Sequence, residues 1–392
     1  MNLKGKPVLI IGAGPVGLTL GWLLNLAGVP VHIFEEQDTI PSQLRASTFH
    51  PPTLDLFSPS GITSDLHKVG RKTRKWQIRM YETGERAEFD LKVISSDTKY
   101  PYRLQCPQVE LCKAIYKRLD EGICHFGFPV SSIKQNKNFV SLTADNVEIT
   151  GSIVVGCDGA RSLVRKIMGV DFVGSTYPES TILITTDLPI EEHLEGLSGV
   201  NYVWTKEGTF SLLKLPNCWR ISLHPPTDER EEDALEDISI KKQILRIMPS
   251  AKNINIFEKR IYKVHQRIAS SYRKGRMFLA GDSAHLNSPK GGMGMNGGIH
   301  DAWSLAKKII SVFNGENSII LDQYERQRRT IALEDIIAQT NKKREIMMAK
   351  STEEKVAYLK ELQSIAANPA LSRQYLLRSS MIEGLRRAEK IR

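Results

Sequence analysis

The chain has 392 residues, of which 41% are hydrophobic and 25% charged, and its formal net charge is +10. These values exclude a disordered, collagen-like or membrane-bundle protein, and the length favours two interlocked domains over one core. The positive excess is concentrated near the C-terminus, where residues 342–392 hold 12 Lys or Arg and 6 Asp or Glu. Because acids are interleaved with the bases, this segment is typical of a solvated amphipathic helix, and we infer no nucleic-acid binding.

The N-terminal segment has no charged residue from Pro7 to Phe34, but Gly12, Gly14 and Gly17 interrupt its first half. A signal peptide or a membrane span would need an unbroken apolar run there, so we expect neither and predict no integral membrane segment. The five cysteines show no CxxC motif and no spacing typical of zinc, and no metal site is expected. Unpaired thiols predict a reducing, cytoplasmic location.

The first chemical motif follows an apolar run at residues 7–11, which is typical of a buried parallel strand. A helix is expected over residues 18–26 and a second strand over 31–34, ending at Glu35. In this context Gly12 makes a tight turn, Gly14 lets a pyrophosphate approach the backbone, and Gly17 lets the helix pack on the strand. Glu35 is placed to hold an adenosine ribose, so the segment predicts dinucleotide binding. The site also includes Pro15, Val16 and Glu36.

The middle of the chain contains mostly strands. A helix is expected over residues 108–119, an antiparallel meander over 130–149, and a buried strand over 153–155 that runs into Asp158. Two stretches, 72–99 and 181–225, have strand periodicity and many aromatic residues, and they predict one antiparallel sheet built from two insertions. Taken singly, such aromatic residues are more often core than substrate contacts. As a group they are the best candidates to cover the bound cofactor: Tyr202, Trp204 and Phe210.

Nucleotide-fold character returns at residues 276–280, an apolar strand that delivers Asp282 at its carboxyl end, where a carboxylate can bind a polyol hydroxyl group. A glycine-rich loop runs from Pro289 to Gly298, and a helix is expected after it. The bare N–H groups at the start of that helix can stabilise negative charge on a cofactor. After Leu321 the chain is expected to be helical almost to its end, with a break at Asn368-Pro369.

Together these motifs resemble the class A flavoprotein monooxygenases, the family typified by para-hydroxybenzoate hydroxylase and phenol hydroxylase. The resemblance spans most of the chain, and its most specific part is GDSAH at residues 281–285 followed by PKGGMGMNGGIHDA. The segment VVGCDGARSLVR, which contains Asp158, resembles the central motif of the family. Two positions depart from the family pattern: Met293 stands where many members have Gln or Glu, and Lys290 stands where a small or apolar residue is common.

The resemblance implies an FAD cofactor, reduced by NADPH or NADH without a second dinucleotide-binding domain. It implies hydroxylation of a phenolic, aromatic or heteroaromatic substrate with O2, through a flavin C4a-hydroperoxide. Catalytic roles fall on Pro289 and Lys290 beside the isoalloxazine, although Lys290 has a second interpretation as a solvated loop lysine. Flavin contacts are implied for Arg45, Gln108, Asp158, Asp282, Pro289, Gly292, Gly294, Met295 and Asn296.

A small substrate is expected, with Lys290, Arg103 and Arg220 as candidate anchors for an anionic group. Two alternatives stay open. One is a hydroxylase, epoxidase or reductase of an isoprenoid or quinone precursor, which could use the basic tail at a membrane. The other is a non-catalytic flavin-binding protein. A homodimer is the expected assembly.

The predicted fold is α/β, with a Rossmann-like FAD-binding domain, an inserted antiparallel-sheet substrate domain and a C-terminal helical segment. The FAD-binding domain is assigned to residues 1–71, 101–176 and 265–345, and the substrate domain to 72–100 and 177–264. Residues 346–392 are expected to form helices that pack on the FAD-binding domain.

Overall fold

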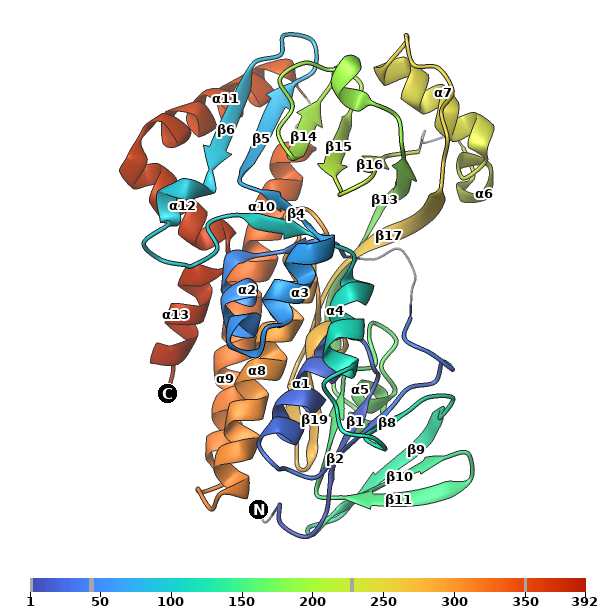
Figure 1. Cartoon of the computed structure of the whole chain (residues 1–392), viewed down its shortest axis with the longest axis vertical. Helices are drawn as coiled ribbons and strands as arrows, with labels where there is room; N and C mark the ends of the chain where they lie inside the picture. Colours follow the sequence, from blue (N-terminus) through green and yellow to red (C-terminus); the bar gives the residue numbers. More distant parts are fainter. Residues whose placement is uncertain (1–2, 42–45, 226–228, 349–350) are drawn as a thin grey trace.

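A six-stranded, mostly parallel sheet forms the lower half of the molecule (Figure 1). The computed structural model describes residues 3–41, 46–225, 229–348 and 351–392. The order across the sheet is β18 (Arg273–Lys274), β19 (Met277–Leu279), β12 (Ile153–Gly156), β1 (Val8–Ile11), β2 (Val31–Phe34) and β8 (Cys124–His125). The central strand β1 is buried throughout and pairs in parallel with β2 and β12, as its continuous apolar run predicts.

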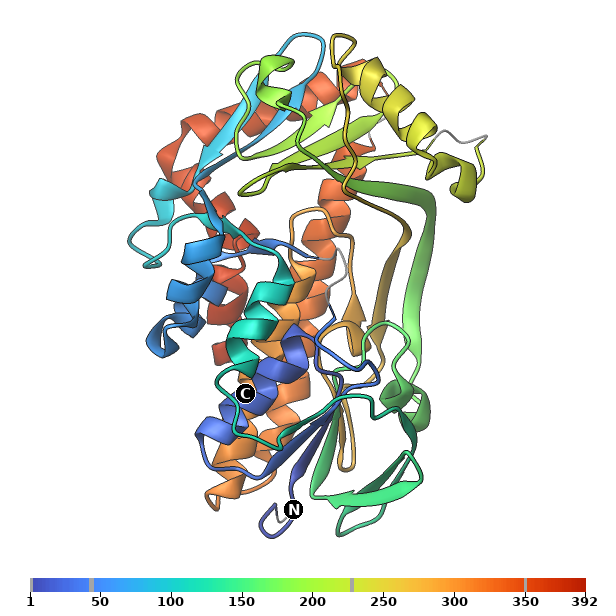
Figure 2. The ribbon, with the colours of Figure 1, turned by 45° about the vertical axis from the view of Figure 1, so that its right-hand side comes forward.

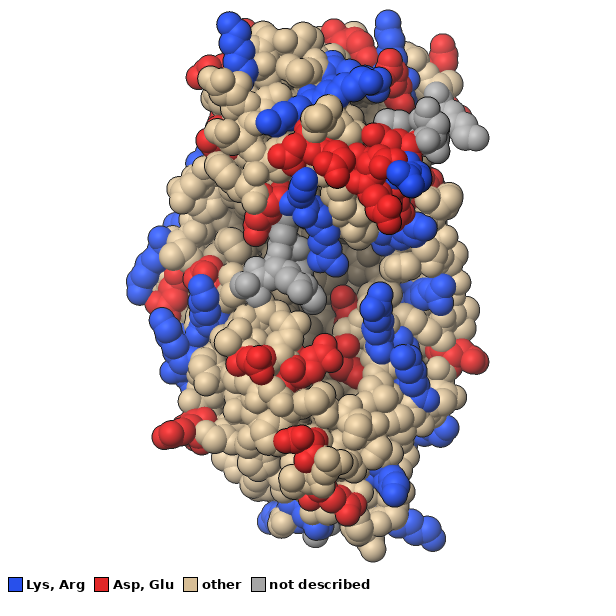
Figure 3. Space-filling model, turned by 90° about the vertical axis from the view of Figure 1, so that its right-hand side faces the viewer, with Lys and Arg blue, Asp and Glu red and all other residues tan. Residues whose placement is uncertain are grey.

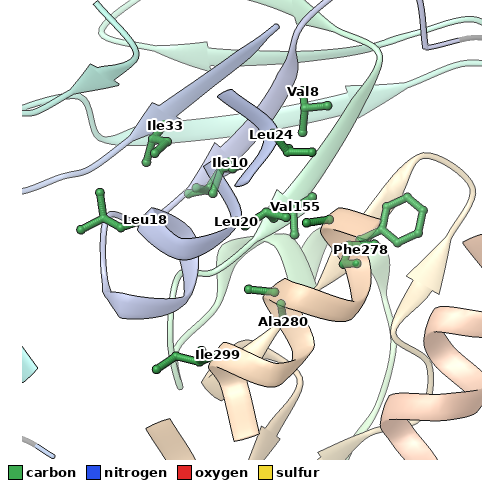
Figure 4. Packing of buried hydrophobic residues seen from close by; sticks show 14 of the residues in the cluster. Val8, Ile10, Leu18, Leu20, Leu24, Ile33, Val155, Phe278, Ala280 and Ile299 are labelled. Carbon is green, nitrogen blue, oxygen red and sulfur yellow. The ribbon is translucent and has the colours of Figure 1, made fainter. Parts of the chain in front are cut away.

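Two helices pack side by side on one face of this sheet, namely α1 (Pro15–Leu26) and α8 (Gly294–Phe313). Figure 4 shows the apolar layer between the sheet and these helices. Ile10, Val155 and Phe278 come from the sheet, and Leu20 and Ile299 come from the helices. The expected meander packs on the same core and consists of β9 (Val130–Gln135), β10 (Val140–Ala144) and β11 (Val147–Gly151). The other helices of this half are α2 (Pro51–Phe57), α3 (Ile62–Val69), α4 (Gln108–Tyr116), α5 (Leu163–Met168) and α9 (Ile320–Ile331).

An eight-stranded sheet forms the upper half (Figure 1). Its order is β20 (His285–Leu286), β17 (Glu258–Ala269), β13 (Phe172–Thr186), β16 (Trp219–Leu223), β15 (Thr209–Lys214), β14 (Val200–Trp204), β5 (Lys75–Met80) and β6 (Arg86–Asp90). Strands from both predicted insertions share this sheet, as expected. The arrangement differs at one pair, because β5 and β14 run parallel. They belong to different insertions, so no hairpin forces them to be antiparallel.

The two faces of the upper sheet have different coverings, because side chains alternate along each strand. Val203 and Phe210 face α6 (Glu231–Ala234) and α7 (Asp237–Ile247). Trp76, Tyr202 and Trp204 lie on the opposite face. Part of that face is covered by the C-terminal helices α11 (Thr352–Ala367), α12 (Pro369–Ser379) and α13 (Ile382–Lys390).

The C-terminal segment is helical, as predicted, and the Asn368 side chain caps α12 by accepting from two backbone N–H groups. Its packing differs from the prediction. Helix α13 lies against α9 of the lower half, whereas α11 packs against β6. Leu359, Leu362 and Leu376 are buried in the core of the upper sheet, which offers the larger apolar face.

The two halves are joined by long strands, since β13 and β17 run from the upper sheet to the lower half (Figure 2). The expected domain boundaries at 176/177 and 264/265 therefore fall inside these strands, close to a register shift between Thr176 and Ser180. The division into domains stays a prediction. Between the halves lies a small sheet of β3 (Thr48–Phe49), β7 (Arg103–Gln105) and β4 (Arg71–Thr73), and α10 (Ala338–Met347) follows a π-helical turn at Ala332–Ile337.

Among the described residues, no helix combines the length and the apolar character needed to cross a bilayer.

Candidate active site

The glycines of the first motif differ in what surrounds them. Gly12 has φ +102°, and a Cβ added there would lie 2.5 Å from the carbonyl oxygen of Cys157. A Cβ on Gly17 would lie 1.9 Å from the carbonyl oxygen of Gly12. A Cβ on Gly14 would meet no atom of the described residues within 4 Å. The first two glycines therefore serve the turn and the packing, whereas the open side of Gly14 leaves room for a phosphate.

Helix α1 begins directly after Gly14 with Pro15, and no side chain of the described residues caps its N-terminus. Its first N–H groups are thus available to an anion. The carboxylate of Glu35 is buried at the end of β2 and accepts hydrogen bonds from Ala13 N at 2.8 Å and Gln37 N at 3.1 Å. These bonds hold Glu35, the predicted partner of the ribose, beside the turn at Gly14. The adjacent Glu36 is exposed.

The three sequence motifs converge on this turn. Val16 packs against both Gly281 and Gly298, since a Cβ on either glycine would lie within 3 Å of a Val16 methyl group. The first and third motifs are therefore in van der Waals contact. Asp282 is exposed in the same turn, at the carboxyl edge of the parallel sheet. This edge is where ligands bind in sheets of this kind.

The side chain of Asp158, in the second motif, forms hydrogen bonds with the backbone of the protein. Its Oδ2 accepts from the backbone N–H groups of Leu163, at 2.7 Å, and Val164, at 3.2 Å, at the start of α5. Burial raises the pKa of Asp158, and Oδ1 has no hydrogen-bond partner among the described residues.

A buried ion network holds the Asp282 turn against α8. Asp301 accepts from Arg328 at 2.6 Å, from His285 at 2.8 Å and from the backbone N–H of Gly281 at 3.1 Å. Burial alone would raise the pKa of Asp301, but Arg328 and His285 lower it to about 2. His285 therefore orients the turn, the role that sequence reasoning favoured over acid–base chemistry.

Both backbone polar groups of Gly291, in the glycine-rich loop, form hydrogen bonds with side chains. The N–H of Gly291 donates to the Tyr202 hydroxyl group at 3.1 Å, and its carbonyl oxygen accepts from His50 Nε2 at 2.8 Å. The carbonyl oxygen of Gly292 accepts from Asn296 Nδ2 at 2.8 Å. Gly291 and Gly292 have φ values of +103° and +68°, which other residues rarely adopt. The loop is thus preorganised by side chains from both halves.

Asn296 is a structural residue of this loop. Its Oδ1 accepts from His50 N at 2.9 Å, and its Nδ2 also donates to the Thr48 carbonyl oxygen at 2.8 Å. Any contact between Asn296 and a flavin would therefore use its backbone. Helix α8 begins at Gly294, followed by Met295, and no side chain within the described ranges caps it, so its first N–H groups are available to a ligand.

The predicted substrate residues fall into two groups. Tyr202 touches the loop, and Arg220 lies on the same face of the sheet and donates from Nη1 to Ser47 Oγ at 2.7 Å. Trp204 is buried beneath the C-terminal segment and donates to the Ile346 carbonyl oxygen at 3.2 Å. Phe210 faces α7 on the far side. Tyr202 and Arg220 therefore lie on the face that meets the loop, and the other two have packing positions; contact of Tyr202 or Arg220 with a substrate stays a prediction.

Lys290 is half-buried rather than solvated. Burial and the nearby Arg344 guanidinium lower its pKa to about 8, while Glu179 opposes this. Arg344 binds both Glu179 oxygens, at 2.6 and 2.8 Å. Lys290 thus shares its surroundings with a carboxylate and a competing cation, and its catalytic role stays a prediction.

Sequence reasoning missed Lys343, which approaches the loop from α10. Its Nζ lies 2.8 Å from the position that a Cβ on Gly291 would occupy, and 6.0 Å from the centre of the Trp76 ring. Arg103 lies over the same ring at 5.2 Å. Residue 343 belongs to no sequence motif, and only its place in the fold brings it here.

The remaining predicted flavin contacts lie at the junction of the two halves. Gln108 begins α4 and is buried, and its N–H donates to the Ala46 carbonyl oxygen at 3.1 Å. Arg45, the other predicted contact in this region, lies outside the described residues. Pro289 is exposed at the start of the loop. Figure 3 shows that the face of the molecule turned by 90° from Figure 1 is hollowed at mid-height, with Lys and Arg side chains above and beside the hollow.

These residues fit an FAD molecule. The open side of Gly14 and the uncapped N-terminus of α1 suit a pyrophosphate, and the Glu35 carboxylate suits a ribose. The exposed Asp282 suits a polyol chain, and the uncapped start of α8 suits a flavin ring that gains negative charge.

Comparison with known proteins agrees with this fit. Residues 6–339 match the family model described as an FAD binding domain. The chain is 29% identical over 401 residues to para-nitrophenol 4-monooxygenase of Pseudomonas sp. (strain WBC-3), covering 98% of this chain and 97% of that protein. It is 31% identical over 344 residues to the 3-(3-hydroxy-phenyl)propionate/3-hydroxycinnamic acid hydroxylase of Mycolicibacterium smegmatis, covering 84% of this chain. The match spans 59% of that hydroxylase.

Solved structures show the same likeness. The structure of p-nitrophenol 4-monooxygenase PnpA from Pseudomonas putida DLL-E4 superposes with a TM-score of 0.89 at 27% identity, over 97% of this chain and 98% of that one. Aklavinone-11 hydroxylase, solved with FAD and aklavinone, gives a TM-score of 0.77 at 25% identity, over 91% of this chain and 71% of that one. The chain belongs to the FAD-binding family of class A flavoprotein monooxygenases. It is an FAD-dependent monooxygenase.

Proposed function

We propose that the chain hydroxylates a small phenol, or an aromatic or heteroaromatic acid, with O2 and either NADPH or NADH as co-substrates. The observation that supports this most strongly is the hydrogen bond between Tyr202 and the N–H of Gly291. It joins the aromatic face of the upper sheet to the loop beside which a flavin ring would lie. A planar substrate between that face and that loop would be close to the cofactor.

FAD supplies the electron transfer and the oxygen activation when it is bound. In this proposal the ribose is bound by Glu35, the pyrophosphate by the turn at Gly14, and the polyol chain by Asp282. The protein contributes a fixed binding geometry and the exclusion of water. The hydrogen bonds from Gly291 to Tyr202 and from His50 to Gly291 fix the binding geometry, because they hold the loop before the substrate arrives.

The charge around the loop supports a substrate that carries an anionic group. Lys290, Lys343, Arg103 and Arg220 all approach this region from different elements. A long neutral lipid would gain nothing from these cations, whereas an aromatic acid or phenolate would be oriented as well as bound. We also propose that the enzyme works in the cytoplasm as a homodimer.

The proposal is tested with purified, FAD-loaded protein. We expect yellow protein with one FAD per chain, and NADPH or NADH oxidation that accelerates when a phenol or aromatic acid is added. Mass spectrometry should find a product with one added oxygen atom. A protein that binds FAD but oxidises neither nucleotide faster with any member of such a panel would contradict the proposal and favour a non-catalytic flavin-binding protein.

A further inference from the structure

Two cations share one aromatic ring beside the glycine-rich loop. The Arg103 guanidinium carbon lies 5.2 Å from the centre of the Trp76 ring, and Lys343 Nζ lies 6.0 Å from it. Arg103 is 1% exposed and Lys343 is half-buried, so Arg103 forms the inner layer and Lys343 the outer one. The ring attracts both cations, but a neutral ring offers far less stabilisation than a carboxylate.

No carboxylate of the described residues contributes to the electrostatic surroundings of either cation. Arg103 is faced by Lys343 and His50 and by the Tyr202 and Tyr375 hydroxyl groups, which oppose the lowering of its pKa by burial. The groups that face Lys343 are Arg103 and His50. Burial lowers the pKa of His50 well below its usual value, so it adds no charge at neutral pH. Nε of Arg103 has no hydrogen-bond partner within the described part of the chain.

An unpaired buried cation costs folding free energy, so a binding site is a physical reason to keep one. The other two candidate anchors differ, because Glu179 lies near Lys290 and Glu258 lies near Arg220. The pair on Trp76 is therefore the place near the loop where an incoming anion would relieve the most unpaired positive charge. Lys343 is the member that the loop touches, at Gly291.

We propose that Lys343 binds the anionic oxygen of the aromatic substrate, a phenolate or a carboxylate, and that Arg103 acts behind it as a positioning residue. This rests on the proposed function and deepens it by naming the group that the enzyme recognises. The Tyr202 hydroxyl group connects the glycine-rich loop with the two cations, since it accepts from Gly291 N and faces Arg103. A ring held by Lys343 would lie against the loop, with its opposite end free to project toward the flavin.

Binding to the FAD-loaded enzyme tests this, followed through the visible absorbance of the flavin at neutral pH. Two matched pairs of probes separate the two anions: 4-hydroxybenzoate with 4-hydroxybenzamide for a carboxylate, and 4-nitrophenol with 4-nitroanisole for a phenolate. The wild-type enzyme should bind the charged member of at least one pair about tenfold more tightly than its neutral partner. In Lys343→Met this preference should fall to about threefold or less.

Two control variants accompany the test. Lys342→Met removes the neighbouring charge on the exposed side of α10, and it should keep the wild-type preference. Lys343→Arg keeps the charge and should retain most of the preference. Equal binding within both pairs by the wild-type enzyme would overturn the proposal, and so would a preference that survives in Lys343→Met. A third contrary result is a Lys343→Met variant whose flavin reduction potential changes without probes while the preference does not, because the charge would then serve the cofactor. These measurements need no turnover, so their failure is distinguishable from a failure of the hydroxylation assay.

Discussion

Replacing Lys343 by methionine should stabilise the substrate-free enzyme, because the exchange keeps the side-chain length and removes a charge that burial disfavours. Burial and the nearby Arg103 lower the pKa of Lys343 from 10.5 to about 7. The difference, at about 1.36 kcal/mol per pH unit, sets an upper limit of about 5 kcal/mol on the folding free energy that the charged side chain costs, because Lys343 keeps some exposure to solvent. For a chain of 392 residues, this is a rise in Tm of up to about 6 °C.

The pH dependence has a definite sign. The folded state holds the Lys343 proton less tightly than the unfolded chain does, so the cost is complete below pH 7 and fades as the pH rises toward 10.5. At pH 9 the remaining cost is about 2 kcal/mol. The gain in Tm of Lys343→Met over wild type should therefore be largest near pH 6 and less than half as large at pH 9.

The assay is thermal unfolding of FAD-loaded, substrate-free protein, followed by circular dichroism at several pH values. Lys342→Met, on the exposed side of the same helix, should show neither a gain nor a pH trend. A Lys343→Met variant that melts below wild type at pH 6, or whose difference from wild type is the same at all pH values, would refute the idea of a buried, unpaired ammonium group.

Three further perturbations test other parts of the site. Gly14→Val should lower the affinity for FAD by more than tenfold with little change in the Tm of the apoprotein, because the new side chain would meet only a ligand. Gly17→Ala should instead lower the Tm of the apoprotein through a clash within the turn. Equal melting of the two apoproteins would contradict this contrast. Tyr202→Phe leaves the Gly291 N–H without its partner, which costs about 1–3 kcal/mol, and we expect NAD(P)H oxidation to yield more hydrogen peroxide and less product; unchanged coupling would show that this hydrogen bond is dispensable. Asp301→Asn breaks a buried ion network and should cost about 3–5 kcal/mol of stability, so a Tm within one degree of wild type would count against the network.

Local sequence was sufficient where a motif is contiguous. The turn around Gly12, the strand that ends at Glu35 and the turn that carries Asp282 each depend on neighbours in the chain, so their positions could be predicted. The alternation of strand side chains could also have separated Tyr202 from Phe210, but which face meets the cofactor depends on how α7 and the C-terminal helices cover the sheet.

Long-range placement was not predictable in this way. Lys343 belongs to no motif, and it reaches the loop because α10 passes between the two halves. Two of the three hydrogen bonds that occupy the Asn296 side chain join it to His50 and Thr48, almost 250 residues away, so sequence spacing gave no sign of them. The parallel pairing of β5 with β14 likewise depends on how two separate insertions meet.

The most direct test of hydroxylation is the fate of oxygen when FAD-loaded enzyme, NADPH or NADH and an anionic phenol are mixed under isotopically labelled O2. We predict that the phenol accelerates nucleotide oxidation and that the product carries one labelled oxygen atom, in an amount that approaches the nucleotide consumed. Nucleotide oxidation that no phenol or aromatic acid accelerates, or a product without labelled oxygen, would contradict the account.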